Sequence, residues 1–225
     1  MQLIESGYRE KSRDYFDIDR HDLLALVPSV PHGRVLEVGA GEGSLLVAIK
    51  RSGKAREVIG VELMAARNGA QNRPELDRFI IADIETETLD IAPESIDVLI
   101  CGDVLEHLRD PWTVLSRLAR LLKTGGTAVL SLPNILHWHA IGTILRGDFR
   151  YAPAGVLDRT HLRFFCRKNM IELIEGAHLE IVSSEPSFMR HRALARDRFR
   201  NALTLGFAER FFAQQYLYVA RKRAS

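Results

Sequence analysis

Several features that would place this sequence in a specialised class of protein are missing from it. Only two cysteines occur, Cys101 and Cys166, far apart and outside any Cys-x-x-Cys pattern. We therefore expect reduced thiols and a cytoplasmic protein rather than a disulfide framework. No apolar run approaches the roughly 20 residues that a membrane-spanning helix needs. The first residues, MQLIESGYREKSRDYF, are polar and mixed in charge, unlike a signal peptide. A net charge of +2 does not indicate a DNA partner.

The composition that remains is that of an ordinary globular protein. Of 225 residues, 46% are hydrophobic and 27% are charged, which argues against disorder. The length suits one α/β domain, and no internal repeat or low-complexity linker divides it. We expect a single domain over residues 1–225, with an N-terminal arm and helix at 1–32. Segments 134–165 and 187–213 fall outside the regular pattern and are expected to shape the acceptor side.

Short β-branched runs alternate with helix-period segments, which is typical of a mostly parallel sheet covered on both faces. The expected helices include Ser44–Arg51, Trp112–Leu122 and Lys168–Glu175. Asp110 and Pro111 are suited to begin the second helix, and the glycines of Lys123–Gly126 to end it. The expected strands are Arg34–Val38, Glu57–Val61, Arg78–Ile81, Ile96–Cys101, Gly126–Leu132, His178–Ser183 and Tyr216–Ala220.

The sharpest motif is the segment Glu37-Val-Gly39-Ala-Gly41-Glu-Gly43-Ser, in which a buried strand runs into a glycine loop that opens a helix. Glycines allow positive φ and close approach of a ligand, and a helix N-terminus offers backbone N–H groups. A plain turn would also tolerate them. However, the spacing is GxGxG rather than the GxGxxG of dinucleotide binders, and an acid precedes the first glycine by two positions. The loop therefore predicts a nucleotide-like cofactor other than NAD.

Two further acids follow strands that end at the same edge of the predicted sheet. Glu62 comes about 20 residues after the loop, where an acid accepts hydrogen bonds from both ribose hydroxyls. Asp83 follows the next strand. Either acid alone could be a solvated strand-end residue, but with the glycine loop they indicate a cofactor site.

With these motifs in order, the sequence resembles the class I S-adenosylmethionine (SAM)-dependent methyltransferases. The resemblance runs through EVGAGEG, VIGVEL, IIADI, IDVLICGDVLEHLRDP and LLKTGGTAVLSLPN, and the later LDRTHLRFF resembles bacterial members. It implies a three-layer, Rossmann-like α/β fold with a seven-stranded, mostly parallel sheet whose last strand is antiparallel. It also implies SAM as cofactor, S-adenosylhomocysteine as product, and an acceptor that is a small molecule or a cell-envelope or polysaccharide intermediate.

The same resemblance assigns roles to residues of the cofactor site. Those near the methionine end of SAM would be Glu37, Gly39, Ala40 and Gly41. Glu62 would hold the ribose, and the adenine would meet Leu63, Asp83 and Ile84; Asp103 is also expected to contact the cofactor.

The catalytic residues are less sharply indicated, because methyl transfer from SAM requires alignment of the acceptor more than an invariant triad. Asp103, Glu106 and His107 are spaced so that they could share one face of a turn. His107 could be a general base, or the three could form a divalent-metal site, since some RNA-end and quinone-precursor methyltransferases have a related pattern. They could also simply tie loops together. His161, in the irregular segment, is the other candidate base or a structural histidine. We expect His161 or His107 to act as base and no metal to be required.

The arginine-rich stretch from Arg190 to Arg200 could bind an anionic acceptor or a membrane surface, or be a solvated helix face. The predicted function is methyl transfer from SAM to oxygen or nitrogen of a small-molecule or saccharide-type acceptor, by a monomer or homodimer. A non-catalytic SAM-binding or scaffold domain is the alternative, and an NAD-dependent oxidoreductase a weaker one.

Overall fold

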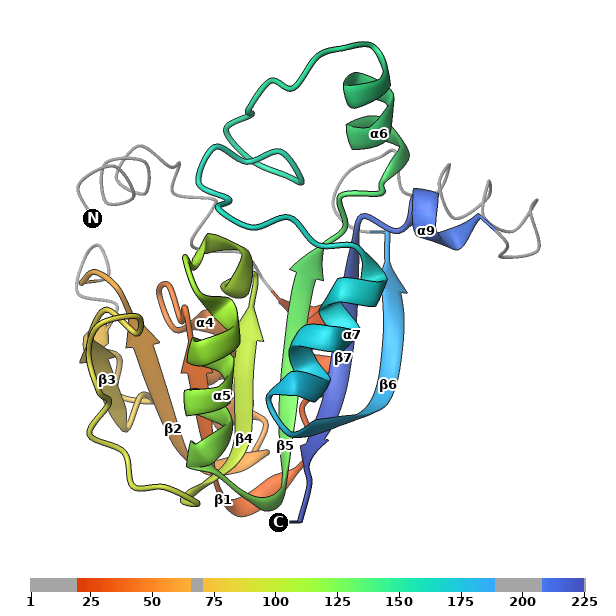
Figure 1. Ribbon diagram of the computed structural model, residues 1–225. Coiled ribbons are helices and arrows are strands. Elements are labelled where there is room, and N and C mark those ends of the chain that lie inside the picture. The colour runs from red at the N-terminus through yellow and green to blue at the C-terminus, as the bar shows by residue number, and fades with distance from the viewer. Residues whose placement is uncertain (1–19, 66–70, 189–207, 225) are drawn as a thin grey trace.

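The computed structural model describes residues 20–65, 71–188 and 208–224, and its centre is a seven-stranded sheet in the order β3-β2-β1-β4-β5-β7-β6. Six strands point the same way, and β7 runs antiparallel to both of its neighbours (Figure 1). The predicted fold class is therefore confirmed. The strands are β1 (Val30–Val38), β2 (Ala55–Glu62), β3 (Arg78–Ile81), β4 (Ile96–Gly102), β5 (Leu122–Pro133), β6 (Leu179–Ser187) and β7 (Gln215–Lys222).

Helices cover both faces of this sheet. On one face, α5 (Pro111–Leu121) and α7 (Arg167–Gly176) pack into a core that includes Leu36 and Leu99. On the other, α3 (His21–Leu26) and α4 (Ser44–Arg51) pack into a core that includes Val35. Neighbouring residues of β1 enter different cores because successive side chains of a strand point to opposite faces.

The start of α5 agrees with the local sequence signals, whereas its end is determined by packing of the core. The side chain of Asp110 accepts the backbone N–H of Thr113 at 3.1 Å, and Pro111 opens α5, as predicted. The predicted glycine stop after α5 is wrong. Leu122 is already extended and begins β5, while Gly125, with φ of 75°, lies inside that strand. Leu122 is fully buried, so its place in the core fixes the end of the helix.

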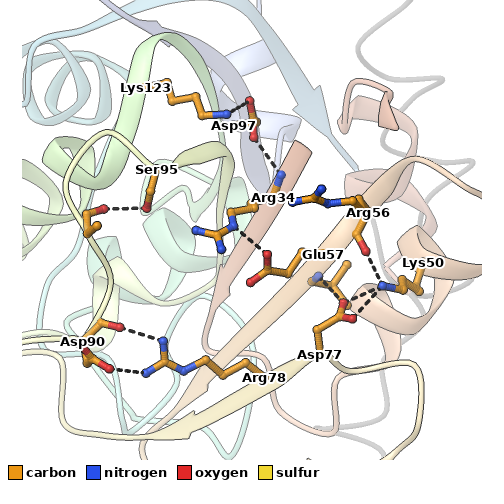
Figure 2. Close-up of polar contacts among 12 residues, drawn as sticks. Arg34, Lys50, Arg56, Glu57, Asp77, Arg78, Asp90, Ser95, Asp97 and Lys123 are labelled. Carbon is orange, nitrogen blue, oxygen red and sulfur yellow. Dashed lines mark hydrogen bonds and ion pairs between the residues drawn. The ribbon is translucent and has the colours of Figure 1, made fainter. Parts of the chain in front are cut away.

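Ion pairs join the amino-terminal ends of the strands, at the edge opposite the predicted site (Figure 2). Asp97 accepts the backbone N–H of Arg34 at 2.8 Å and the ammonium of Lys123 at 2.7 Å. Lys50 of α4 donates to Asp77 at 2.7 Å. Burial alone would raise the pKa of Asp97, but these donors hold it below its usual range. The carboxyl-terminal edge is left for ligands, as expected of an open α/β sheet.

The segment after β5 lies beyond the carboxyl ends of β4 and β5 (Figure 1). It contains α6 (Trp138–Leu145) and its own small core of Ala140, Val156 and Leu157. A second insertion follows β6, and of it the structure describes α9 (Glu209–Phe212); the arginine-rich stretch lies outside the described residues. Among those described, no helix has the length and apolarity to cross a bilayer.

Candidate active site

The glycine loop joins β1 to α4 at the carboxyl-terminal edge. Gly39, Gly41 and Gly43 have φ of 72°, 55° and 74°, a region that residues with a Cβ rarely adopt. Gly39 is also tightly confined, because a Cβ there would lie 2.4 Å from Cγ2 of Val104. The backbone N–H groups of Gly39 and Ala40 donate to the carbonyl of Val61 on β2. The loop thus has the backbone shape predicted from the sequence.

Glu62, the last residue of β2, binds this loop directly. Its Oε2 accepts the N–H of Gly41 at 2.8 Å, and its Oε1 accepts the N–H of Leu63 at 2.9 Å. Burial raises the pKa of Glu62, although these two hydrogen bonds oppose the shift. Each carboxylate oxygen keeps a second acceptor site, so the carboxylate can hold the loop and still accept ligand hydroxyls.

Glu37 lies beneath the loop on β1 and is 6% exposed. Among the described residues, its Oε2 is fully buried and has no hydrogen-bond partner. Burial raises the pKa of Glu37 to about 8; Arg20 lowers it and Glu62 raises it further. A buried carboxylate without a donor is costly, and a cationic ligand group would relieve that cost.

Arg20, immediately before α3, was not predicted as a site residue. Its guanidinium donates to Asp103 at 2.7 Å, to Ser131 at 3.2 Å and to Asp22 at 2.9 Å. Burial alone would lower the pKa of Arg20, but the neighbouring carboxylates, Asp103 foremost, raise it above its ordinary value. No motif surrounds Arg20 in the sequence. Its importance follows from the packing of α3 over the ends of β4 and β5.

Asp103 is held in this same network rather than beside Glu106 and His107. Its φ of 56° is unusual for a residue with a side chain. Its Oδ1 accepts from Ser131 Oγ at 2.9 Å and from Gln215 Nε2 at 2.5 Å. The shared face suggested by the sequence spacing is therefore wrong, because the chain turns sharply at Asp103.

Asp83 and Ile84 follow β3, which pairs with β2 so that Ile81 lies opposite Glu62. The Asp83 carboxylate accepts the N–H of Glu85 at 2.9 Å and the hydroxyl of Thr86 at 3.0 Å. Asp83 therefore shapes a turn at the same edge of the sheet as Glu62, on the side away from Asp103.

The structure brings both predicted histidines together with Glu106. Glu106 and His107 lie in the 3-10 turn Leu105–His107, and His161 comes from the insertion. The His107 and His161 rings meet edge to face with centroids 4.8 Å apart. His161 Nε2 lies 3.9 Å from Glu106 Oε1. All three side chains are buried.

Aromatic side chains of the insertion continue outward from this cluster. Phe164 lies with its ring centroid 6.3 Å from that of His161, and Phe149 packs against Phe164 at 5.7 Å and against Tyr151 at 5.4 Å. Phe149 and Tyr151 are exposed. The insertion thus places an apolar, aromatic surface next to buried imidazoles.

Residues 8–184 match a family model described as a methyltransferase domain. Among curated proteins, a ubiquinone biosynthesis O-methyltransferase of Xanthomonas campestris pv. campestris is 34% identical over 119 residues, 51% of this chain and 49% of that protein. A protein of the same name from Idiomarina loihiensis is 29% identical over 166 residues, 67% of this chain and 63% of that protein. The chain thus spans about half to two thirds of the length of these relatives.

A solved structure shares the fold over most of both chains. It is a Burkholderia thailandensis 1,6-didemethyltoxoflavin-N1-methyltransferase with bound 1,6-didemethyltoxoflavin and S-adenosylhomocysteine. The TM-score is 0.63 at 18% identity, covering 99% of this chain and 86% of that one. By the match of its family model over residues 8–184, this chain belongs to the methyltransferase-domain family, and it shares the fold of that solved methyltransferase.

Proposed function

We propose that this protein transfers a methyl group from SAM to a hydroxyl oxygen of a small-molecule acceptor. The observation that carries the proposal is the buried Glu37 carboxylate, whose Oε2 has no donor among the described residues. The methionine end of SAM bears an ammonium group, which would supply that donor.

The charges around Glu37 also suit the methionine end of SAM, which carries both an ammonium and a carboxylate group. Arg20 and Glu37 interact electrostatically, so a cation and an anion stand at one end of the site. In the proposed complex, Glu37 binds the ammonium of SAM and Arg20 faces its carboxylate. Gly39, Ala40 and Gly41 let the backbone approach this end of the ligand.

The other end of the cofactor extends along the ends of β2 and β3. Glu62 would accept both ribose hydroxyls, since ribose recognition needs acceptors and each of its oxygens has one to spare. Leu63, Asp83 and Ile84 would surround the adenine. Asp103 would meet the cofactor or position Arg20 for it.

When bound, SAM supplies a methyl group on a sulfonium, which is an excellent leaving group. The chain's own residues then have to orient the acceptor, exclude water and receive the hydroxyl proton. His161 Nδ1 lies 3.1 Å from the carbonyl of Val156. Because a carbonyl only accepts, Nδ1 carries the proton and Nε2 is the basic atom. His161, or His107 beside it, would act as the base.

The aromatic residues Phe149, Tyr151 and Phe164 favour an acceptor with a flat apolar face. The two curated relatives are O-methyltransferases of ubiquinone biosynthesis by name. A ring hydroxyl of a quinone precursor is therefore the first acceptor to assay, with phosphorylated and sugar-linked hydroxyls as the anionic and saccharide classes. The proposed reaction can be carried out by a monomer or by a homodimer.

The test is transfer of radiolabelled methyl from SAM to a panel of phenolic, sugar and phosphorylated hydroxyl compounds. We expect His161→Ala to lower kcat by about 10²–10⁴-fold with SAM affinity unchanged. His32→Gln, an exposed histidine on β1, is the control. SAM binding without transfer to any acceptor class would favour a scaffold role, and loss of SAM affinity in His161→Ala would make His161 structural.

A further inference from the structure

Gln215, the first residue of β7, has no part in the chemistry of methyl transfer, yet it reaches the network around Arg20 and Asp103. Its Nε2 donates to Asp103 Oδ1 at 2.5 Å. Because β7 is antiparallel to its neighbours, its first residue lies at the carboxyl-terminal edge of the sheet, opposite Pro133 of β5 and Ser187 of β6 (Figure 1). The hydrogen bond therefore joins the start of β7 to the residue that follows β4.

The Asp103 carboxylate is oriented by donors on both of its oxygens. Oδ1 accepts from Gln215 and, at 2.9 Å, from Ser131 Oγ, and Oδ2 accepts from Arg20 Nη1 at 2.7 Å. The backbone N–H of Asp103 donates to the same Ser131 oxygen at 3.0 Å. Ser131 is fully buried. It and Gln215 together fix one carboxylate oxygen, and the other oxygen is thereby presented to Arg20.

The backbone that carries Gln215 is held by other contacts. Gln214 donates its N–H to the carbonyl of Ser187 at 3.0 Å, and its own carbonyl accepts the N–H of Asn134 at 2.9 Å. The fully buried Asn134 also donates from Nδ2 to the carbonyl of Ala213 at 2.8 Å. The start of β7 is therefore tied to the ends of β5 and β6, and the Gln215 side chain extends from backbone that is already fixed.

The guanidinium of Arg20 is oriented by this network and by Asp22. Nε and Nη2 donate to Asp22 at 2.9 and 3.2 Å, and Nη2 also donates to Ser131 at 3.2 Å. With the bond from Nη1 to Asp103, one N–H on Nε, two on Nη2 and one on Nη1 have acceptors. A guanidinium has five N–H groups, and within the described residues the fifth, on Nη1, has no acceptor. Because the group is planar, the direction of the bond to Asp103 sets the direction of that remaining N–H.

We propose that Gln215 is a positioning residue for cofactor binding: by holding Asp103, it directs the remaining N–H of Arg20 to the carboxylate of SAM. The inference rests on the proposed function, in which Arg20 faces that carboxylate. Gln215 acts through Asp103 and needs no contact of its own with the cofactor or the acceptor. A guanidinium that is oriented before the ligand arrives loses less freedom on binding, so the contribution of Gln215 is to SAM affinity.

Gln215→Met tests this role, because it keeps the length of the side chain and removes the donor. Calorimetry on the full-length variant should show SAM binding about tenfold weaker than in the wild type, since a hydrogen bond to a charged group is lost one step away from the ligand. Affinity for decarboxylated SAM, which keeps the ammonium and lacks the carboxylate, should be the same in both proteins. Gln214→Met is the matched control and should bind both ligands as the wild type does, because Gln214 takes part in the contacts described above through its backbone only.

The outcomes separate this inference from the function on which it rests. Failure of the wild-type protein to bind SAM would overturn both. If the wild type binds SAM, wild-type SAM affinity in Gln215→Met, or an equal loss of affinity for SAM and for decarboxylated SAM, would overturn the positioning role alone. In an Arg20→Gln background, Gln215→Met should weaken SAM binding no further, because the residue through which it acts is gone. Ser131→Ala removes the other side-chain donor to Asp103 Oδ1 and should show the same selective loss, so the test stands even where Gln215→Met does not fold.

Discussion

Glu62 Oε2 accepts the backbone N–H of Gly41 at 2.8 Å, so the acid at the end of β2 holds the glycine loop that follows β1. The same carboxylate is the proposed ribose ligand. Under this proposal, the Glu62 side chain both holds the glycine loop in shape and binds the cofactor.

Glu62→Ala should weaken SAM binding by about 3–6 kcal/mol, since two hydrogen bonds to a charged acceptor, each worth about 1.5–3 kcal/mol, are lost. Calorimetry on the folded variant measures this. Glu57→Ala removes an acid at the opposite end of the same strand, where it pairs with Arg34 at 2.6 Å, and should leave SAM affinity unchanged. Wild-type affinity in Glu62→Ala would disprove the ribose assignment.

Glu37→Gln should stabilise the free protein while weakening SAM binding. The pKa of Glu37 is raised from 4.5 to about 8 by burial, so the unfolded state ionises first and Glu37 destabilises the fold progressively as pH rises from 4.5 to 8. Urea unfolding of the wild type should show this loss, and Glu37→Gln should flatten it. Equal pH dependence in both proteins would mean that Glu37 is not buried as described.

Gly39→Ala should abolish SAM binding and cost more stability than Gly53→Ala. Both glycines have positive φ, 72° and 68°, where a side chain costs about 1–2 kcal/mol. At Gly53, however, a Cβ would meet nothing within 4 Å, whereas at Gly39 it meets Val104. The difference between the losses of unfolding free energy in Gly39→Ala and Gly53→Ala therefore measures the cost of the contact between the new Cβ and Val104. Equal losses, with SAM binding kept in Gly39→Ala, would show that the loop is not tightly confined.

Arg20→Gln should weaken SAM binding and lower the Tm, because it leaves Asp103 without its cation. Arg20→Lys should restore stability in part but not affinity, since lysine lacks the planar fork that contacts Asp103 and Ser131 together. The control is Arg34→Lys, because Arg34 lies toward the amino-terminal ends of the strands, away from the proposed SAM site. Full SAM affinity in Arg20→Lys would assign Arg20 a structural role alone.

Local sequence signals were enough to predict where the strands lie, whereas the antiparallel last strand was expected from the family resemblance. Each of the seven expected strands overlaps an observed one, because buried parallel strands appear as short apolar runs between turns. The helix Ser44–Arg51 was predicted to the residue. The end of α5 was missed because burial of Leu122, rather than Gly125, determines where the chain straightens.

The candidate site was predictable where one short segment carries it, as in the glycine loop. Arg20 and Asp103 are 83 residues apart, so their ion pair left no trace in local spacing. His161 was singled out, but its meeting with Glu106 and His107 depends on how the insertion folds back. Asp103 was grouped with Glu106 and His107 because a regular turn was assumed, and its positive φ removes that regularity.

The central claim is that the buried acid and the glycine loop form a SAM site, and calorimetry with three ligands tests it most directly. Wild-type protein should bind SAM and S-adenosylhomocysteine with similar stoichiometry of one per chain and should not bind NAD. Glu37→Gln should lose affinity for both sulfur compounds, because both carry the ammonium group. Binding of NAD in preference to SAM, or Glu37→Gln binding SAM as tightly as the wild type, would contradict the account.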